Sequence, residues 1–318
     1  MPNFQKVQES LDKIINALFA MKDAFKEDGP AEAAQPKKAQ PVEVRSLAAA
    51  GTAEDYGSFD ALKKALQSDK WPEAVNPNLI CDPNNDADKV ERGRGIIELM
   101  IEEDLKGLKI LDIGCGEGHT ASISTEYGTT MSVGYDIVES ERWAGFAADK
   151  KNLLYTTDFE KVKEQGPFDV IVIFDVLDHI KGETPVALLE KAKSVLSDEG
   201  KIYMRCHPFT SRHATHLYHD INKAYVHLVF SDEELAELVP SSEHQEDSIR
   251  VIYPVKTYTE FVDQAGLKIG NRRDITERVE PFFKIPKIAE RIMKNTQTTK
   301  FPDFQLTLQF IDFVLKKQ

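Results

Sequence analysis

The chain has 318 residues, of which 41% are hydrophobic and 29% are charged, and its formal net charge at pH 7 is −13. Because a single hydrophobic core stops growing at roughly 250 to 300 residues, this length predicts one main domain with an extension. No apolar run approaches the roughly 20 residues of a membrane span, and the acidic balance disfavours nucleic acid, which needs clustered Lys and Arg.

The cellular compartment is predicted from the N-terminus and the cysteines. Charged residues such as Lys6 and Asp12 interrupt the first apolar residues, which fits neither a secretory signal nor a transit peptide. Cys81, Cys115 and Cys206 are scattered and lack metal-ligand spacing. We therefore expect a soluble cytoplasmic protein with reduced thiols and no membrane partner.

Residues 1–28 are predicted to form an amphipathic helix with a heptad repeat. The apolar positions alternate in spacing between three and four; they are Phe4, Val7, Leu11, Ile14, Leu18, Met21 and Phe25. This pattern is typical of a coiled coil, so residues 4–25 are candidates for forming a homo-oligomer or docking into a larger assembly. A single helix packed on its own domain is the alternative, because isolated helices this short are marginally stable.

The rest of the chain divides by composition and periodicity. Residues 29–57 are rich in Pro and Ala without periodicity and are expected to form a tether. Residues 58–86 should hold a short helix over 59–66, capped by Ser58, and a loop that leads into the main domain. Residues 87–318 alternate between strand and helix, which predicts a parallel sheet covered on both faces.

The elements of this sheet are placed by apolar runs and turn residues. The expected strands are 108–113, 130–135, 152–156, 168–174, 201–206, 267–270 and 305–316. The expected helices are 87–104, 120–127, 140–148, 184–196 and 259–265.

The segment LKILDIGCGEGHT places Gly114, Gly116 and Gly118 between a strand and a helix, where a doubly wound sheet binds its ligand. A dinucleotide fingerprint needs its third glycine one residue later, where this chain has His119, and the Gly-Lys-Ser/Thr of a Walker loop is absent. Asp112, just below the turn, would repel a pyrophosphate but suits an ammonium or sulfonium charge.

Two further acids stand at the ends of the next two strands. Asp136 is placed to accept hydrogen bonds from both hydroxyls of a ribose. Asp158 could accept from the exocyclic amine of an adenine, on which the ring of Phe159 could stack. An ordinary helix cap is the alternative role for Asp158.

Taken in order, LDIGCGEG, GYD, TTDFE and FDVIVIFDVLDHI resemble the motifs of class I S-adenosylmethionine-dependent methyltransferases. The resemblance covers about residues 87–317. It implies an α/β fold with a doubly wound, mostly parallel, seven-stranded Rossmann-like sheet whose last strand is antiparallel. Here that fold would carry an N-terminal helical extension. The resemblance also implies S-adenosylmethionine as the cofactor.

Carried onto this sequence, the resemblance assigns a set of cofactor-binding residues. The methionine part would lie along Asp112, Gly114, Cys115 and Gly116, with Gly118 in the same turn. The ribose would be held by Asp136, the adenine by Asp158 and Phe159, and the methyl group would be bordered by Asp175.

The run DVLDHI places Asp175, Asp178 and His179 just after the fourth strand. It resembles an acid-x-x-acid-His run that helps to hold a divalent metal in ubiquinone-pathway O-methyltransferases and small-RNA 3′-end methyltransferases. This chain has the shorter aspartates where those have glutamates, so we predict no metal and keep a divalent cation as the alternative. Without a metal, Asp178 and His179 would cap the following turn. His179 is also kept as a candidate catalytic residue, since histidine is the first choice for a general base at neutral pH.

A histidine-rich segment, RCHPFTSRHATHLYHDINKAYVH, follows the fifth strand and holds five of the eight histidines. His207 is our first candidate for the acceptor-side base, because it lies closest to the strand end. His213, His216 and His219 are spaced by three, so on a helix they would share one side and could ligate a metal or act on substrate. The alternative is that most of these histidines are solvated or satisfied by local hydrogen bonds.

A substrate-covering insertion is expected over about residues 207–260. Within it, FSDEELAELVP should form a helix with a capping box made by Ser231 and Glu234. Arg205 and Arg212 are candidates for holding an anionic acceptor. Several aromatic residues would either line an apolar acceptor site or belong to the core; they are Tyr218, Tyr225, Tyr253, Phe282 and Phe283.

The leading functional hypothesis is methyl transfer from S-adenosylmethionine to oxygen of a small-molecule acceptor. The second is a structural or assembly protein, for example a virion component, that retains the fold and is anchored by its N-terminal helix. Methylation of DNA amino groups is disfavoured, because DVLD stands where those enzymes typically carry Asn-Pro-Pro-aromatic.

Overall fold

The computed structural model describes residues 56–76, 85–180, 184–214, 217–239 and 252–318. The helix predicted over residues 1–28 and nearly all of the predicted tether lie outside these residues. None of the helices in the described ranges has the length and apolarity that a bilayer span requires.

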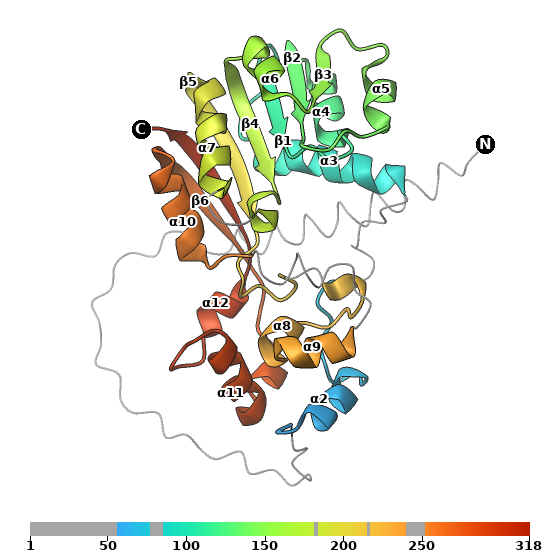
Figure 1. The fold of residues 1–318 in the computed structure, drawn as a ribbon, viewed down its shortest axis with the longest axis vertical. Helices are drawn as coiled ribbons and strands as arrows, with labels where there is room; N and C mark the ends of the chain where they lie inside the picture. Colours follow the sequence, from blue (N-terminus) through green and yellow to red (C-terminus); the bar gives the residue numbers. More distant parts are fainter. Residues whose placement is uncertain (1–55, 77–84, 181–183, 215–216, 240–251) are drawn as a thin grey trace, which may run out of the picture. The chain divides into compact units, whose positions relative to one another are not determined.

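The described residues build a seven-stranded sheet in the order β3-β2-β1-β4-β5-β7-β6 (Figure 1). The strands are β1 (Lys109–Ile113), β2 (Met131–Tyr135), β3 (Leu153–Thr156), β4 (Phe168–Phe174), β5 (Leu196–Cys206), β6 (Leu267–Thr276) and β7 (Leu308–Lys317). Strands β1 to β5 pair in parallel, whereas β7 is antiparallel to β5 and to β6. The predicted Rossmann-like sheet with an antiparallel last strand is therefore confirmed.

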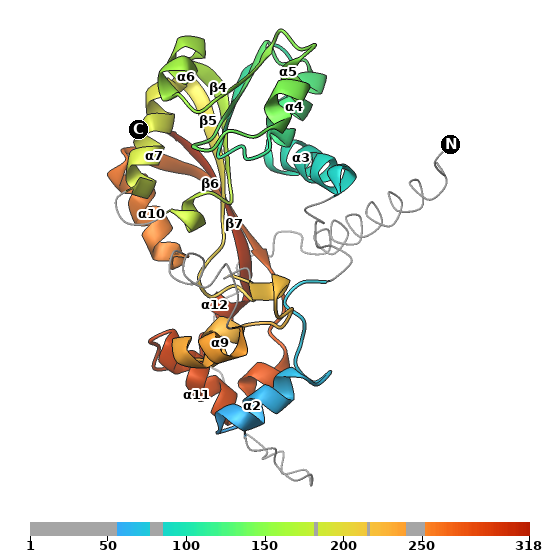
Figure 2. The same cartoon turned by 45° about the vertical axis from the view of Figure 1, so that its right-hand side comes forward.

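Helices cover both faces of the sheet (Figure 2). They are α3 (Asp86–Met100), α4 (His119–Ser124), α5 (Arg142–Ala147), α6 (Phe159–Gln165), α7 (Thr184–Val195) and α10 (Val255–Gln264). Two adjacent residues of β4 belong to different cores: Ile171 lies in the cluster that includes Leu189 of α7, and Val172 lies in the cluster that includes Ile97 of α3. This alternation is why β4 reads as a continuous apolar run.

A separate helical cluster joins three distant chain segments. It contains α2 (Phe59–Leu66), α8 (Val226–Val229), α9 (Asp232–Leu238), α11 (Pro286–Asn295) and α12 (Asp303–Thr307), together with Trp71. The Trp71 ring stacks on Phe230 at 5.6 Å, and its indole N–H donates to the carbonyl of Ala224 at 2.9 Å. Residues 56–71, expected only to lead into the main domain, therefore contribute to this core.

Two other expectations concern the helical cluster. Tyr225 and Phe283 are buried in it, their ring centroids 4.7 Å apart, so these two aromatic residues belong to a core rather than to an acceptor site. The capping box at α9 is confirmed, because Ser231 and Glu234 exchange both hydrogen bonds.

Two glycines of α3 provide a matched test of how this helix packs on α4. A Cβ atom at Gly93 would lie 2.8 Å from Ile123 and 3.3 Å from the backbone nitrogen of Thr120, whereas a Cβ atom at Gly95 meets nothing within 4 Å. We expect Gly93→Ala to destabilise the protein by about 1–3 kcal/mol through overpacking. Gly95→Ala should stabilise it by about 0.5–1 kcal/mol through helix propensity. Urea unfolding measures both, and stabilisation by Gly93→Ala would contradict this packing.

Candidate active site

The glycine turn after β1 is closed by backbone hydrogen bonds and needs its glycines. The N–H groups of Gly114 and Cys115 donate to the carbonyl of Tyr135 at 2.8 and 3.2 Å, which ties the turn to the end of β2. Gly118 has φ +92°, and a Cβ atom there would lie 2.4 Å from the Tyr155 ring. A side chain at this position would therefore be strained and would clash.

Asp136 lies at the end of β2 with its carboxylate against the glycine turn. It accepts hydrogen bonds from the N–H groups of Gly116 at 2.8 Å and of Val138 at 3.1 Å. The indole N–H of Trp143 in α5 donates to the carbonyl of Gly116 at 2.9 Å. The next two side chains after Asp136 are apolar yet open to solvent, Ile137 at 83% and Val138 at 67% exposure.

Asp112 is buried beneath the same turn. Burial, reinforced by the negative charge of Asp136, raises the pKa of Asp112 to about 7. The positive charge of Arg92 acts in the opposite direction. The site therefore holds a carboxyl group that a cationic ligand would help to ionise.

Three other residues predicted at the cofactor site have structural contacts of their own. Asp158 caps α6, a helix that was not predicted, by accepting from the N–H of Glu160 at 2.9 Å. The ring of Phe159 packs edge-on to Tyr135 at 5.3 Å. Cys115 is half-buried, and burial raises the pKa of its thiol.

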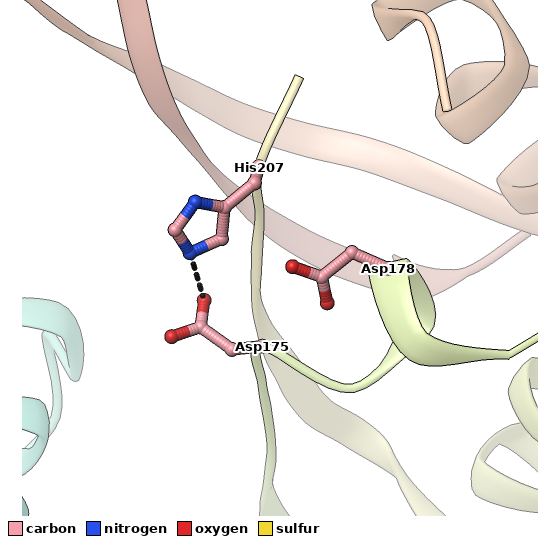
Figure 3. Close-up of side chains that lie close together, drawn as sticks. All are labelled: Asp175, Asp178 and His207. Carbon is pink, nitrogen blue, oxygen red and sulfur yellow. Dashed lines mark ion pairs between the residues drawn. The ribbon is translucent and has the colours of Figure 1, made fainter. Parts of the chain in front are cut away.

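A buried acid–histidine cluster lies where β4 and β5 end. Asp175 follows β4, Asp178 lies in the short 3-10 turn Leu177–His179, and His207 follows β5. Parallel strands bring their carboxyl ends to the same edge of the sheet, so residues far apart in sequence meet here. The three side chains point toward one another (Figure 3), and the Nε2 atom of His207 lies 3.2 Å from the Oδ1 atom of Asp175.

The electrostatics of the cluster are set by burial and close charges. Asp178 is fully buried, and neither of its carboxylate oxygens has a hydrogen-bond partner among the described residues. Burial, together with the charge of Asp175, raises the pKa of Asp178 to about 6. Burial opposes ionisation of Asp175 and His207 too, but their mutual attraction lowers the pKa of Asp175 and raises that of His207.

Arg92 was not among the predicted site residues. Its guanidinium lies 3.1 Å from the Oδ2 atom of Asp175 and 5.2 Å from the centre of the Phe174 ring, and its charge also acts on Asp112. The only signal in the sequence is a pair of cations one helical turn apart, Lys89 and Arg92, in the helix before the glycine strand.

The remaining histidines do not form the predicted set. His179 is exposed, whereas the adjacent Asp178 is buried. His213 lies in a turn rather than in an α-helix, with its ring 5.1 Å from that of His207. His216 lies outside the described residues, and His219 ends the 3-10 helix Leu217–His219. Among the described residues, His213 and His219 therefore do not lie on one α-helix.

Arg205 and Arg212 both pair with carboxylates of the chain. The guanidinium of Arg205 donates to both oxygens of Asp312 at 2.6 and 2.8 Å. That of Arg212 donates to Glu277 at 2.9 Å and to Glu280 at 2.6 Å. These contacts disfavour the role of an anion-binding pair for the acceptor.

The profile of a family described as "Methyltransferase domain" matches residues 87–269, which is more than half of the chain. The chain belongs to this methyltransferase family. The "Ubiquinone biosynthesis O-methyltransferase" of Neisseria meningitidis serogroup C is 24% identical over 186 residues, 55% of this chain and 70% of that protein. The protein of the same name from Pseudomonas aeruginosa PAO1 is 24% identical over 199 residues, 60% of this chain and 77% of that one.

Among solved structures, a putative S-adenosylmethionine-dependent methyltransferase from Listeria monocytogenes is 18% identical with a TM-score of 0.46, covering 72% of this chain and 98% of that one. The family match, the sheet order and the ordered motifs together show an S-adenosylmethionine-dependent methyltransferase. The methyltransferase fold thus carries the glycine turn and the acid–histidine cluster at neighbouring strand ends.

Proposed function

We propose that this methyltransferase transfers its methyl group to an oxygen atom of a small-molecule acceptor. The observation that carries the proposal is the Asp175–His207 pair, which lies beyond the ends of β4 and β5, beside the strand that delivers the glycine turn. A hydroxyl acceptor must lose a proton during transfer, and a buried acid–histidine pair suits that task. The relatives named O-methyltransferases agree with this choice of atom.

The cofactor contacts in this proposal follow the charges of S-adenosylmethionine. Asp112 faces its ammonium group, and Asp136 holds the ribose hydroxyls. Arg92, which lies beside Asp175 and acts on Asp112, is the cation available for the carboxylate of S-adenosylmethionine. The exposed apolar side chains of Ile137 and Val138 offer a surface for the adenine. Gly114, Gly116 and Gly118 keep the turn open for the methionine part, and Asp175 borders the methyl group.

Alignment is the main contribution of the chain to methyl transfer. The methyl carbon is already activated by the sulfonium, so holding it in line with the acceptor oxygen can contribute about 7–11 kcal/mol. The acceptor oxygen would be prepared at the Asp175–His207 pair. His179 is exposed and stays a second candidate for this step. A divalent cation, raised by the DVLDHI run, would be a second cofactor at the same place.

Mass spectrometry of reaction products tests the proposal. Full-length protein is incubated with S-adenosylmethionine and a panel of matched phenols and aromatic amines. We expect methylation of a phenol, which is lost in His207→Asn while calorimetry still detects cofactor binding. Methylation confined to amines would overturn the choice of oxygen, and a protein that binds neither S-adenosylmethionine nor S-adenosylhomocysteine would overturn the assignment of the site.

Cofactor affinity is expected to fall as the pH drops, because the ionised form of Asp112 binds the cationic ligand. The pKa of Asp112 is about 7 in the free protein, so below that pH binding must first remove a proton. The dissociation constant should therefore rise by up to about tenfold per pH unit between pH 7 and pH 5.5. Titration calorimetry of S-adenosylmethionine measures it. Asp112→Asn should bind weakly with a flatter pH profile, and an equal pH slope in both proteins would contradict the prediction.

Self-association or docking through residues 4–25 and a cytoplasmic location stay predictions from the sequence. The heptad pattern supports the first of them. Light scattering of the full chain against a variant that lacks residues 1–28 tests it, and an unchanged particle size would remove its support.

A further inference from the structure

We infer that Trp143, supported by Tyr155, is a positioning residue for the cofactor: it fixes the glycine turn and, through the turn, the carboxylate of Asp136. The inference rests on the ribose contact that the proposed function gives to Asp136, and it is independent of the acceptor. Trp143 lies in α5, is 5% exposed and was not among the residues predicted at the site.

The segment from Asp136 to Trp143 holds Gly116 from both of its ends. At the start, the carboxylate of Asp136 accepts from the N–H of Gly116 at 2.8 Å. At the end, the indole N–H of Trp143 donates to the carbonyl of the same glycine at 2.9 Å. Both peptide groups that flank Gly116 are therefore fixed, while Gly116 itself stays exposed and accessible to a ligand.

Tyr155 of β3 adds a second anchor to the turn. Its hydroxyl donates to the carbonyl of Gly118 at 2.5 Å, and burial raises the pKa of this hydroxyl, so it stays protonated as a donor. Its ring stacks on that of Trp143, with centroids 5.4 Å apart and planes 12° from parallel. Since α5 and β3 are neighbours (Figure 1), the stacked pair holds two carbonyls of one turn.

Gly134 of β2 makes room for this arrangement. It is the register partner of Tyr155 in the parallel pairing of β2 with β3. A Cβ atom at Gly134 would lie 2.5 Å from the Tyr155 ring and 3.0 Å from the Sγ atom of Cys115. The absence of a side chain at residue 134 therefore allows Tyr155 to reach the turn.

The consequence for binding is preorganisation. A carboxylate that is already held in place loses little conformational freedom when a ligand arrives, so less of the interaction energy is spent on ordering. The exposed side chains of Ile137 and Val138 lie between the two anchored ends of the segment. Trp143 thus acts through Gly116 and Asp136 rather than on the ligand itself.

Calorimetric titration of S-adenosylhomocysteine and of its 2′-deoxyribose analogue into the full chain tests the inference. Wild-type protein should bind the analogue about 10- to 100-fold more weakly, because one hydrogen bond to a charged group is lost. Trp143→Phe keeps an aromatic ring but removes the N–H donor. We expect its affinity for S-adenosylhomocysteine to fall about tenfold and its penalty for the analogue to shrink at least about threefold. A penalty equal to that of the wild type would overturn the inference.

Trp71→Phe is the matched control, because Trp71 is the second of the two tryptophans in the chain. Its indole N–H also donates to a backbone carbonyl at 2.9 Å, that of Ala224, and its ring is buried in the helical cluster. The substitution removes the same donor and should lower the melting temperature while keeping both wild-type affinities. Losses equal to those of Trp143→Phe would overturn the inference, because general destabilisation would then explain them.

Tyr155→Phe keeps the test decisive if Trp143→Phe does not fold. This variant removes only the hydroxyl that holds Gly118 and retains a ring that can stack on Trp143. Affinity for S-adenosylhomocysteine should fall about three- to tenfold, with a smaller penalty for the analogue. Wild-type values for both ligands would overturn the inference.

Asp136→Ala separates failure of this inference from failure of the proposed ribose contact. It should bind the two ligands with about equal affinity. A wild-type penalty in Asp136→Ala would overturn the ribose contact and the inference with it. A penalty that is lost in Asp136→Ala but unchanged in Trp143→Phe would overturn the positioning role alone. Methylation of amines instead of phenols would overturn the choice of oxygen and leave this inference standing.

Discussion

Asp136→Ala is expected to weaken the affinity for S-adenosylmethionine by on the order of 10² to 10⁴-fold. Backbone N–H groups of Gly116 and Val138 hold the carboxylate at the end of β2, and its remaining lone pairs are free for a ligand. Each hydrogen bond from a ribose hydroxyl to the charged group contributes about 1.5–3 kcal/mol, and the substitution removes two of them. Calorimetric titration of S-adenosylmethionine and S-adenosylhomocysteine into both proteins measures the loss.

Glu139→Ala is the matched control for this prediction. Glu139 is an exposed carboxylate three residues further along the same loop, so its removal changes the local charge equally. Cofactor affinity should stay at the wild-type value in this variant. An equal loss in both variants would mean that general charge rather than a ribose contact is responsible. Wild-type affinity in Asp136→Ala would mean that the ribose lies elsewhere.

The sheet and the glycine turn could be predicted because their signals are local. Strand β1, its acid Asp112 and the following glycines lie within about a dozen residues. The apolar run of β4 is typical of a strand that is buried on both faces. The ends of the strands were predicted less accurately. A strand was expected over residues 267–270, but β6 continues to Thr276 because it pairs with β7 along its whole length. The short apolar segment at its start does not reveal that pairing.

The acid–histidine cluster could be predicted only in part, because its members come from different strands. Asp178 and His179 are neighbours in sequence, but the short turn after β4 buries the first and exposes the second. His207 reaches Asp175 only because β4 and β5 are adjacent in the sheet. His207 was the first candidate among the histidines because it lies closest to the end of the fifth strand. The sequence could not show which histidine would contact Asp175.

The helical cluster was the least predictable part. Trp71 donates its N–H to the carbonyl of Ala224, and Phe282 packs 5.1 Å from the same indole. These contacts join segments separated by more than 150 residues, and the spacing of apolar residues within each short helix carries no information about its partners. Local composition therefore led to the interpretation of residues 58–86 as a lead-in, whereas long-range packing makes residues 56–71 part of a core.

Asp312→Ala is expected to lower the free energy of unfolding by about 3–5 kcal/mol, because it breaks a buried ion pair that crosses three strands. Asp312 in β7 stands opposite Arg205 in β5 and Arg273 in β6. Its side chain is only 6% exposed, and it accepts from both guanidinium groups at 2.6 Å. Removal leaves Arg205 without its carboxylate between the rings of Phe174 and Phe310. Urea unfolding measures the change.

The ion pair between Arg272 and Asp274 provides the control on the same edge of the sheet. Both residues lie in β6, their contact is 2.6 Å, and both side chains remain about one third exposed. Asp274→Ala should therefore cost less than about 1 kcal/mol, although the pair is as short as the one at Asp312. The two variants are expected to differ because the two ion pairs differ in burial. Solvent screens the exposed Arg272–Asp274 pair. In Asp312→Ala, by contrast, Arg205 loses its buried carboxylate partner two residues before His207. Equal losses in the two variants would contradict this account of how β7 supports the acceptor side.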